Sequence, residues 1–426
     1  MLISRNPVGR VRASRSRRRA IPTLVIAATA GLVLGACTAP DSDSRSAESL
    51  PWSEVEEQAR GQTVSLWMYG GDEQGNAYVD DVLAPAAADE GITLRRVPVE
   101  STTDAVNRIL TERQAGVTDG EVDLVWVNGA NFGTGKQAGA WLCDWTQNLP
   151  NMQYTDPDDS LLNNDFGTPV DRCESPWHKA QFTLVYNADA IEDPPSTFEE
   201  VLEWAQANPG RFTYPAPPDF TGSVFIREAL VSTSGGIDKV PAQFDRETYD
   251  RLAPVLFDRL NELAPSLWRE GTTYPQSSAE LDDLYAGGQL DMTMTYGPAT
   301  LPELVSGGTF PPNTRVLTLD EGTVGNASFL AIPSTSGQSA AAQMVANLAL
   351  SPEQQLIKSR PDVWGQFTVL DLERLTPDYR QQFEGIPASP VVPSYQELSA
   401  GAHPELSAEW VTPLDEGWRR NVLAGQ

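Results

Sequence analysis

The sequence has few cationic and few metal-binding side chains. Its 426 residues include two histidines, three cysteines, and 30 lysines and arginines against 58 aspartates and glutamates. Seven of the arginines lie in the first 36 residues; without this segment, 23 cationic residues face 58 acidic ones and the formal net charge is −35. Because such a chain repels polyanions, nucleic acid is not expected as a partner. Broad contact with anionic lipid headgroups is not expected either.

Motifs of common hydrolases and zinc enzymes are also missing. The sequence has no G-x-S-x-G, no S-x-x-K and no H-E-x-x-H pattern. No second histidine or cysteine stands at metal-ligand spacing from His178, so we expect neither a metal site nor a cofactor. The abundant acids leave one enzyme class open, because paired carboxylates could serve a secreted hydrolase that acts on carbohydrate.

The glycine-rich stretch VDLVWVNGANFGTGKQAG (122–139) does not fit a nucleotide-binding loop. The phosphate loop needs Gly-Lys followed by serine or threonine, and an earlier glycine at a fixed spacing. Here Gln137 follows Gly135-Lys136, and Ala130 stands where the earlier glycine is required. The stretch instead predicts a buried strand at 122–128 that ends in a polar turn.

The first 36 residues have the pattern of a secretory signal peptide. An arginine-rich start without acids precedes the apolar run IPTLVIAATAGLVLGA. The junction LGAC at 34–37 resembles the bacterial lipobox, which implies that Cys37 is lipidated and becomes the first mature residue. We therefore expect export, by the Sec or the twin-arginine route, and a lipid anchor on the outer face of the bacterial cytoplasmic membrane. Residues 37–57 read as a flexible tether, with order beginning near Trp52.

The two remaining cysteines predict a disulfide bond. Thiols of an exported chain are usually paired. A bond between Cys143 and Cys173 would close the segment that contains NLPNMQYTDPDDSLLNNDFGTPV.

Strand and helix patterns alternate along the rest of the chain. Strand patterns at 63–69, 92–97 and 122–128 enclose helical patterns at 76–90 and 101–116, as in a βαβαβ unit. Further strand patterns stand at 182–186, 211–214, 289–296, 314–319 and 326–332. The alternation predicts an α/β fold throughout.

Several segments, taken in order, resemble the landmarks of a known family. They are GQTVSLWMYGG (61–71), VDLVWVNGANF (122–132), AQFTLVYNADAIEDPPSTFEEVLEWA (180–205), GGQLDMTMTYGPAT (287–300) and SFLAIPSTS (328–336). Their order is similar to that in ABC-transporter solute-binding proteins of the maltose-binding type. The segments DDVLAPAAADEGITLRRVPV (80–99) and GRFTYPAPPDFTGSVFIREAL (210–230) resemble especially the YnjB-type branch of bacterial solute-binding lipoproteins.

The resemblance covers the chain from about residue 60 to its C-terminus. It implies two α/β lobes joined by crossing hinge segments, with a ligand cleft between the lobes. We expect lobe one to contain 58–180 and 320–350, and lobe two to contain 184–317 and 351–426. The family implies a monomer that captures a small solute without converting it and delivers it to an ABC permease. The sequence does not indicate which solute.

Residues at strand ends and helix starts are the candidate ligand contacts, because free N–H groups can reach a ligand from these points. The candidates in lobe one are Trp67, Gly70, Gly71, Asn76, Asn128, Asn131 and, beside the hinge, Trp177. The candidates in lobe two are Tyr214, Asp219, Thr221, Gly222, Ser223, Tyr296 and Gly297. The Thr-Gly-Ser start of a helix suits an anionic group, whereas the acidic chain suits a cationic one.

Overall fold

The structure is a computed structural model that describes residues 50–387, 389–398 and 402–424. The predicted signal peptide and Cys37 lie outside these ranges. No helix within them combines the length and the apolar character that a membrane span needs.

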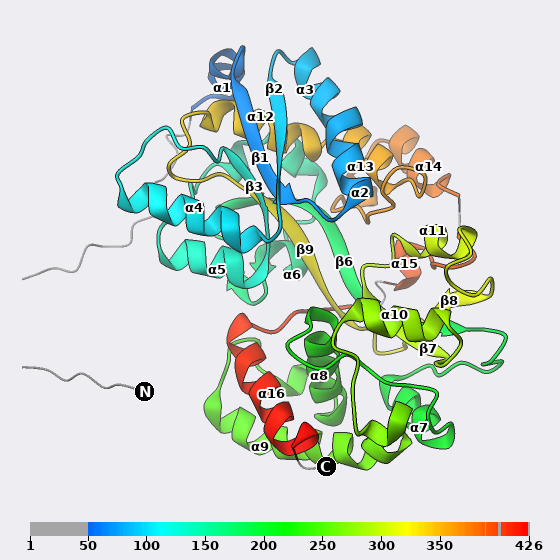
Figure 1. The fold of residues 1–426 in the computed structure, drawn as a ribbon. Coiled ribbons are helices and arrows are strands. Elements are labelled where there is room, and N and C mark those ends of the chain that lie inside the picture. The colour runs from blue at the N-terminus through cyan, green and yellow to red at the C-terminus, as the bar shows by residue number, and fades with distance from the viewer. Residues whose placement is uncertain (1–49, 388, 399–401, 425–426) are drawn as a thin grey trace, which may run out of the picture. The chain divides into compact units, whose positions relative to one another are not determined.

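Among the described residues, eight strands form one mixed sheet (Figure 1). Its main path contains β2 (Thr93–Val99), β1 (Thr63–Tyr69), β3 (Leu124–Val127), β9 (Val324–Ala331), β6 (Glu174–Asn187) and β7 (Met292–Tyr296), in this order. The short strands β8 (Thr314–Val316) and β10 (His403–Pro404) pair with β6 and β9. Strands β1, β2 and β3 are parallel, whereas every pair among β3, β9, β6 and β7 is antiparallel.

The long strand β6 joins two parts of this sheet. Its residues from Glu174 to Gln181 pair with β9, and its residues from Phe182 to Tyr186 pair with β7. The part around β1, β2 and β3 forms the first lobe, and the part around β7 and β8 forms the second. Strands β6 and β9 are thus the crossing segments between two α/β lobes, as expected from the sequence.

The first lobe is covered by helices on both faces of its sheet. Its helices are α1 (Trp52–Ala59), α2 (Glu73–Tyr78), α3 (Ala84–Asp89), α4 (Thr102–Gln114), α5 (Gly129–Gln137), α6 (Ser160–Asn163) and α12 (Ser339–Ala349). Helices α1 and α12 lie side by side, and α4 lies beside α5 (Figure 1). Alternate residues of β1 are buried, as its apolar pattern predicts.

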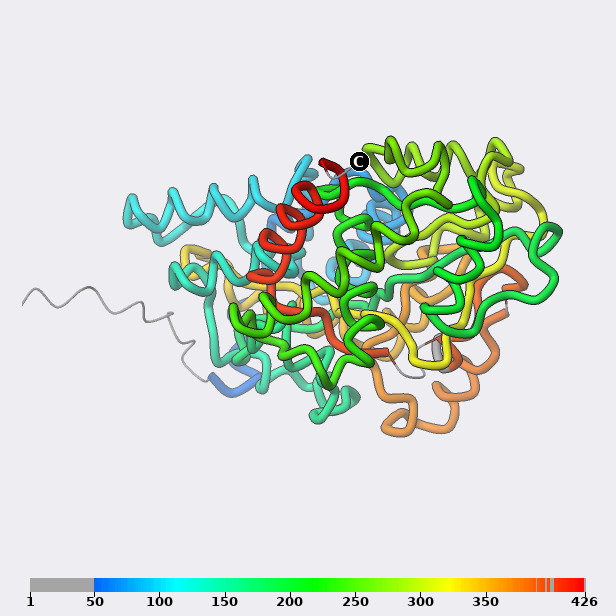
Figure 2. The backbone as a smooth tube through the Cα atoms, turned by 90° about the horizontal axis from the view of Figure 1, so that it is seen from below, coloured from blue at the N-terminus to red at the C-terminus, as the bar shows by residue number. Residues whose placement is uncertain are grey.

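The second lobe packs around a long buried helix. Its helices are α7 (Phe198–Ala207), α8 (Phe220–Thr233), α9 (Arg246–Leu263), α10 (Ser278–Ala286), α11 (Leu301–Ser306), α15 (Tyr395–Leu398) and α16 (Val411–Trp418). Residues 221–231 of α8 are all buried. Helix α16 lies beside α8 and α9, and the turned view of Figure 2 also shows it next to α9.

Two boundaries differ from the sequence-based expectation. The tether was expected to extend to residue 57, but α1 begins at Trp52 and buries Val55 and Ala59. Residues 351–426 were expected in lobe two, but α13 (Pro352–Ser359) and α14 (Pro377–Glu384) contact each other and α13 contacts α12. Side chains of 369–383 also share an apolar cluster with β9 and α6. Apolar packing against the first lobe therefore holds this segment there.

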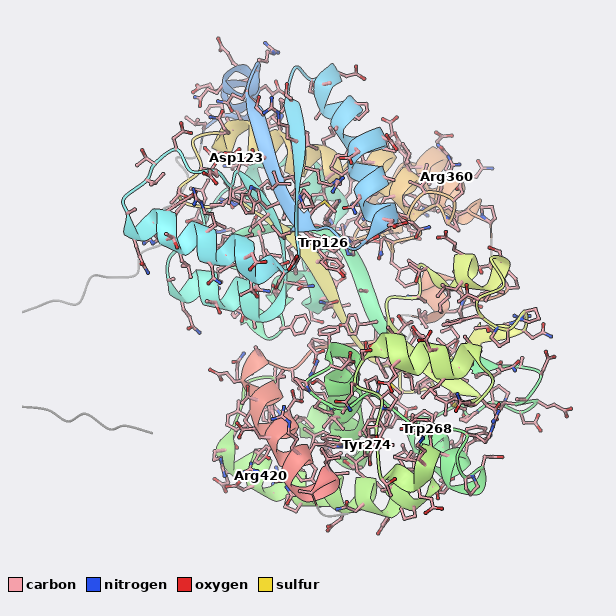
Figure 3. The ribbon with its side chains drawn as sticks, in the orientation of Figure 1. Asp123, Trp126, Trp268, Tyr274, Arg360 and Arg420 are labelled. Atoms are coloured by element: carbon pink, nitrogen blue, oxygen red, sulfur yellow. A yellow bond between two sulfur atoms is a disulfide. The ribbon has the colours of Figure 1, made fainter. Side chains whose placement is uncertain are left out.

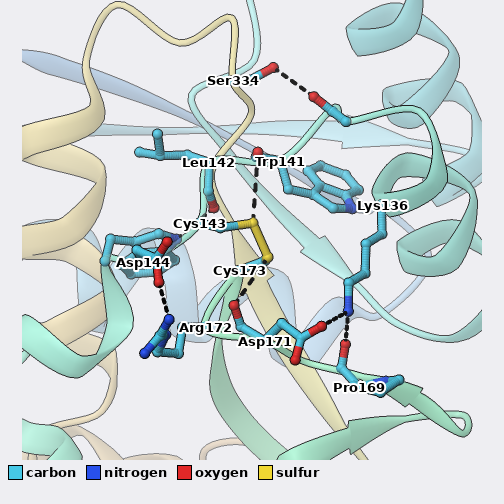
Figure 4. The surroundings of a disulfide bond; sticks show 12 residues. Lys136, Trp141, Leu142, Cys143, Asp144, Pro169, Asp171, Arg172, Cys173 and Ser334 are labelled. Carbon is cyan, nitrogen blue, oxygen red and sulfur yellow. Dashed lines mark hydrogen bonds and ion pairs between the residues drawn. A yellow bond between two sulfur atoms is a disulfide. The ribbon is translucent and has the colours of Figure 1, made fainter. Parts of the chain in front are cut away.

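The predicted disulfide bond between Cys143 and Cys173 is present (Figure 4). Both cysteines are buried in an apolar cluster under α4 and α5. Lys136 on α5 lies near the bond and pairs with Asp171 at 2.7 Å. The bond therefore ties the β4–β5 hairpin, Asn164–Asp165 with Thr168–Pro169, to the first lobe.

Candidate functional site

Local packing accounts for the glycines after β1. Asn76 Nδ2 donates to the carbonyl oxygen of Gly70 at 2.8 Å, and Arg96 donates to Asn76 Oδ1 at 3.1 Å. A Cβ atom on Gly70 would lie 2.9 Å from Pro98 Cβ, and one on Gly71 would overlap an aromatic ring. The predicted ligand contacts Gly70 and Asn76 therefore bond to each other within this turn.

The side chains of β1 divide between the core and the surface. The Trp67 indole Nε1 donates to the carbonyl oxygen of Glu121 at 3.3 Å, and the ring packs on the apolar cluster beneath α4. Tyr69, at the end of the strand, is half exposed. Of the two aromatic residues, Tyr69 rather than the predicted Trp67 is available at the strand end.

The turn after β3 is tied to three other elements. Asn128 Nδ2 donates to Ser328 Oγ on β9 at 3.3 Å. The backbone N–H of Gly129 donates to Asp165 Oδ1 on β4 at 2.7 Å. Asn131 Oδ1 accepts from a hydroxyl of α4 at 3.0 Å. This turn therefore places the first lobe's polar groups beside the crossing strand β9.

An aromatic cluster lies where β6 leaves the first lobe. Trp177 is fully buried, and its ring centre lies 5.1 Å from that of Trp364 and 5.6 Å from that of Trp126. His178 and Tyr78 pack against the same rings. Trp126 is only partly buried at the end of β3 (Figure 3). The predicted Trp177 is thus enclosed, and Trp126 is the ring of this cluster that retains exposed surface.

Tyr214 belongs to the core of the second lobe. Its ring stacks on Phe225 at a centre-to-centre distance of 4.3 Å, and its hydroxyl accepts from Trp418 Nε1 at 3.0 Å. The residue is fully buried. Its packing explains its presence without any solute contact.

The start of α8 is already occupied by a carboxylate of the chain. Asp219 caps the helix by accepting from the N–H of Gly222 at 2.9 Å, and it also accepts from the N–H of Ser278 at 3.0 Å. Ser223 Oγ donates to Asp415 at 2.9 Å. Asp219 therefore already accepts from one of the N–H groups that the sequence offered to an anionic solute.

Two aromatic side chains meet at the edge of the second lobe. Phe220 is 51% exposed, next to the buried Thr221, and its ring lies 5.1 Å from that of Tyr296. Gly297, with φ +90°, turns the chain so that its N–H donates to Gln181 on β6 at 2.9 Å. Tyr296 and Gly297 therefore lie directly beside the crossing strands.

Asp165 lies on the β4–β5 hairpin, whose tip reaches the second lobe. It is fully buried on the β4–β5 hairpin, and one of its oxygens holds the Gly129 turn. Burial raises the pKa of Tyr296 well above its usual value, and the charge of Asp165 adds to this rise. At the tip of the hairpin, a Cβ atom on Gly167 would lie 3.0 Å from Ser407 Cα in the second lobe. The tip of the hairpin thus lies against the second lobe at Ser407.

Asp165 and Glu174 are buried carboxyl groups whose pKa values are raised. Burial raises the pKa of Asp165 to about 7, although the Gly129 N–H acts in the opposite direction. Burial, and then the charge of Asp165, raise the pKa of Glu174 well above its usual value. Asp165 Oδ2 and both oxygens of Glu174 have no hydrogen-bond partner within the described part of the chain.

The second lobe supplies a buried ionic network next to Tyr296. Arg227 donates to both oxygens of Glu405 at 2.7 and 3.0 Å. Glu228 accepts from the N–H of Val324 at 2.8 Å and lies 3.4 Å from His403 Nε2. Burial acts to lower the pKa of His403, but the hydrogen bond and charge of Glu228 outweigh it and raise this pKa. The network anchors α8 to the start of β9.

The structure brings some predicted residues together and leaves others apart. Asn128, Tyr296 and Gly297 lie at the crossing strands, whereas Trp67 and Tyr214 belong to apolar clusters of separate lobes. Sequence reasoning placed the loop 219–223, and with it Phe220, at the cleft, but it missed Asp165, Glu174, Arg227 and Trp126. Nothing in the sequence distinguishes the three charged residues from the other charged side chains of the chain. Trp126 stood beside a predicted position, near the end of a strand.

Metal ligands do not gather in the described ranges. No group of three histidine, cysteine, aspartate or glutamate side chains among these residues is placed to hold a metal ion.

Comparisons with known proteins identify related chains and folds. Residues 81–382 match the profile of the family described as bacterial extracellular solute-binding protein. Protein YnjB of Escherichia coli (strain K12) is 38% identical over 368 residues, which are 86% of this chain and 92% of that protein.

Two solved structures share the fold at low sequence identity. The spermidine/putrescine ABC transporter substrate-binding protein PotD from Streptococcus pneumoniae matches with a TM-score of 0.61 and 14% identity, over 86% of this chain and all of that one. A periplasmic thiamin binding protein matches with a TM-score of 0.54 and 17% identity, over 84% of this chain and 96% of that one. The matched family and both folds are those of binding proteins rather than enzymes, so the carbohydrate-hydrolase alternative is not supported.

Proposed function

The chain belongs to the bacterial extracellular solute-binding protein family, and we propose that it is a lipid-anchored receptor that captures one small solute and delivers it to an ABC import permease. Its fold is that of the type II periplasmic binding proteins. In the proposal, the protein acts as a monomer outside the cytoplasmic membrane and is retained there by a lipid on Cys37.

The crossing of β6 and β9 between the two lobes, beside the aromatic pair of Phe220 and Tyr296, is the observation that carries this proposal. Strands β6 and β9 cross between the lobes directly beside Tyr296. A solute that contacts both lobes would favour the closed arrangement, because it gains contacts there that the open arrangement lacks.

We place the solute beside the crossing strands, between the turn after β3 and the end of β7. Asn128 and Asn131 would offer amide groups from the first lobe, and Tyr296 with Gly297 would form the opposite wall. Phe220 supports this position because its exposed ring stands next to Tyr296. The loops at 70–76 and 219–223 would form the rim of this solute site. Their predicted residues would hold the turns in shape rather than bind the solute themselves.

We further propose a division of the lobes that follows the crossing strands. The first lobe would contain residues 52–180 and 320–350, together with the segment of α13 and α14. The second lobe would contain residues 184–317 and the remaining C-terminal helices. Delivery to the permease would use both lobes, since the permease must distinguish closed from open receptors.

A thermal-shift screen against a library of nutrient solutes tests the function. A solute at 100 times its dissociation constant should stabilise the protein by about 2.7 kcal/mol. Phe220→Ala should reduce this stabilisation by the solute. Val255→Ala should not, because it removes an exposed apolar side chain on α9, away from the proposed site. A library of sugars, amino acids, amines, vitamins and metal complexes without a single stabilising member would overturn the proposal.

A further inference from the structure

The glycines of helix α5 have no role in the solute site proposed above. Gly129, Gly133 and Lys136 are spaced four and three residues apart, so they face the same side of the helix. The β4–β5 hairpin packs on this side. A Cβ atom on Gly129 would lie 3.4 Å from the Phe166 ring, and one on Gly133 would lie 3.4 Å from Thr168 Oγ1. The glycines of α5 therefore let the hairpin approach the helix closely.

Polar and covalent bonds hold the hairpin on the first lobe. Asp165 Oδ1 on β4 accepts from the N–H of Gly129 at 2.7 Å. The Lys136 ammonium group donates to the carbonyl oxygen of Pro169 on β5. The disulfide bond follows four residues after β5. The hairpin is therefore a fixed part of the first lobe.

The tip of the hairpin is buried although it is a turn. Phe166 and Gly167 connect β4 to β5, with φ angles of +44° and +69°. Turns with two positive φ angles favour asparagine, aspartate and glycine, and an aromatic residue is costly there. Phe166 is nevertheless only 6% exposed. Contacts of the tip with other elements, rather than its own turn propensity, therefore hold this conformation.

These contacts include the second lobe. Gln243, which precedes α9, donates through Nε2 to the carbonyl oxygen of Gly167. A Cβ atom on Gly167 would lie 3.0 Å from both Cα and Cβ of Ser407, which precedes α16. Helices α5 and α16 lie on the same side of the crossing strands (Figure 1). A side chain at position 167 would therefore press the hairpin and the second lobe apart.

The receiving surface is built within the second lobe. The N–H of Ser407 donates to the carbonyl oxygen of Ala242 at 2.9 Å, and Trp410 Nε1 donates to the carbonyl oxygen of Pro241 at 3.1 Å. Trp410 is fully buried in the apolar core of this lobe. These bonds join 241–243 to 407–410 without any contribution from the hairpin.

We propose that the β4–β5 hairpin is a latch: seated on the glycines of α5, its tip docks on 241–243 and Ser407 and favours the closed arrangement of the lobes before any solute binds. A contact that favours closure raises the affinity for solute, because a larger fraction of the free protein is already competent to bind. This consequence for affinity rests on the proposed receptor function, whereas the latch itself can be measured without a solute.

Two variants of the contact test the latch in the solute-free protein. Gln243→Ala removes the donor to Gly167, and Gly167→Ala adds a methyl group against Ser407. Small-angle scattering should give both variants a larger radius of gyration than wild type. Hydrogen exchange of the amides at 166–168 and 242–243 should be about fivefold faster in Gln243→Ala, as expected for the loss of one net hydrogen bond.

Matched controls separate the latch from local effects. Gln276→Ala removes an amide that donates to the carbonyl oxygen of Tyr274 within the second lobe at 2.9 Å. Gly116→Ala places a methyl group at a φ of +70°, close to that of Gly167, but no atom lies within 4 Å of it. It therefore carries the backbone strain of Gly167→Ala without the clash. Both controls should keep the wild-type radius of gyration.

The test stays decisive if Gly167→Ala does not fold, because Gln243→Ala changes one side chain at the surface. A folded Gln243→Ala protein with the wild-type radius of gyration would overturn the latch. So would hairpin amides that already exchange in wild type as fast as in an unfolded peptide, or an equal expansion of the controls. The receptor function would stand in each of these cases, because the screen of nutrient solutes tests it separately.

Discussion

Gln74 Nε2 donates a hydrogen bond of 3.1 Å to Glu303 Oε2, and this bond links the two lobes. Gln74 lies on α2 of the first lobe, and Glu303 lies on α11 of the second. The bond is exposed, so its net strength is modest. It is a polar contact between the lobes that lies away from β6 and β9.

Gln74→Ala should therefore favour the open arrangement. The loss of one exposed bond to a charged group should weaken solute binding by about 1 kcal/mol, a factor of about five. Small-angle scattering of the free protein should show a larger radius of gyration. Gln147→Ala is the matched control, since its amide bonds to the carbonyl of Asp144 within the first lobe. Equal effects of the two variants would show that the bond does not hold the lobes.

Loss of the disulfide bond should lower stability without altering the site directly. Cys143 and Cys173 are 30 residues apart in sequence, and closing such a loop is worth about 3–4 kcal/mol on the loop-entropy account. Urea unfolding of the Cys143→Ser/Cys173→Ser protein should show this loss. Reduction of wild type should give a similar loss, whereas a reductant should leave the double variant unchanged. A wild type that is insensitive to reduction would contradict the prediction.

Lipid anchoring depends on Cys37, which lies outside the described residues. In a bacterium that processes lipoproteins, wild type should partition into the detergent phase of a membrane extract. Cys37→Ala should not be lipidated and should partition into the aqueous phase. Cys143→Ser/Cys173→Ser serves as the control, because it removes cysteines without touching the LGAC junction. Similar partitioning of wild type and Cys37→Ala would rule the anchor out.

Two neighbouring aromatic residues should separate folding from binding. Tyr214→Ala should cost about 3–5 kcal/mol of unfolding free energy, because it removes a fully buried ring that stacks on Phe225. Phe220→Ala should cost less than about 1 kcal/mol, since the ring is half exposed. Solute affinity should fall in Phe220→Ala at nearly unchanged stability. The reverse order of the two stabilities would contradict the structure.

The sequence predicted most strands and the two-lobe architecture because these depend on local patterns, but the strand expected at 211–214 is not formed. The buried strand at β3 ends in a polar turn, and the alternating burial of β1 follows its side chains. The segment of α13 and α14 was assigned to the other lobe. Its position depends on apolar contacts with α6 and β9, and a linear pattern does not show which lobe an amphipathic helix will cover.

The site was harder to predict because its residues are distinguished by burial and contacts in the folded chain, not by their type or spacing in the sequence. Asp165 stands in a loop rich in aspartate and asparagine, and only burial beside the Gly129 turn distinguishes it. Asp219 was expected near a solute, but its carboxylate caps α8 and also binds the start of α10. A helix start predicts free N–H groups, yet a capping residue in the same stretch can satisfy them first.

Asp165 should make the free protein less stable as the pH rises. Its pKa is raised from the model-peptide value near 3.8 to about 7 by burial, so the folded state binds a proton more tightly than the unfolded state. Below pH 4 both states are protonated and no stability is lost. Between pH 4 and 7 only the unfolded state releases the proton, so stability falls, and above pH 7 the loss is complete. At about 1.4 kcal/mol per pKa unit, the loss is at most about 4 kcal/mol.

Asp165→Asn should therefore stabilise the free protein at pH 8. The amide cannot ionise, so urea unfolding should show a smaller loss of stability between pH 5 and pH 8 than in wild type. A part of the slope should remain, because Glu174 has a raised pKa and acts in the same direction. Asp171→Asn should keep the wild-type slope. An Asp165→Asn slope equal to that of wild type would show that burial does not destabilise the ionised form of this carboxyl.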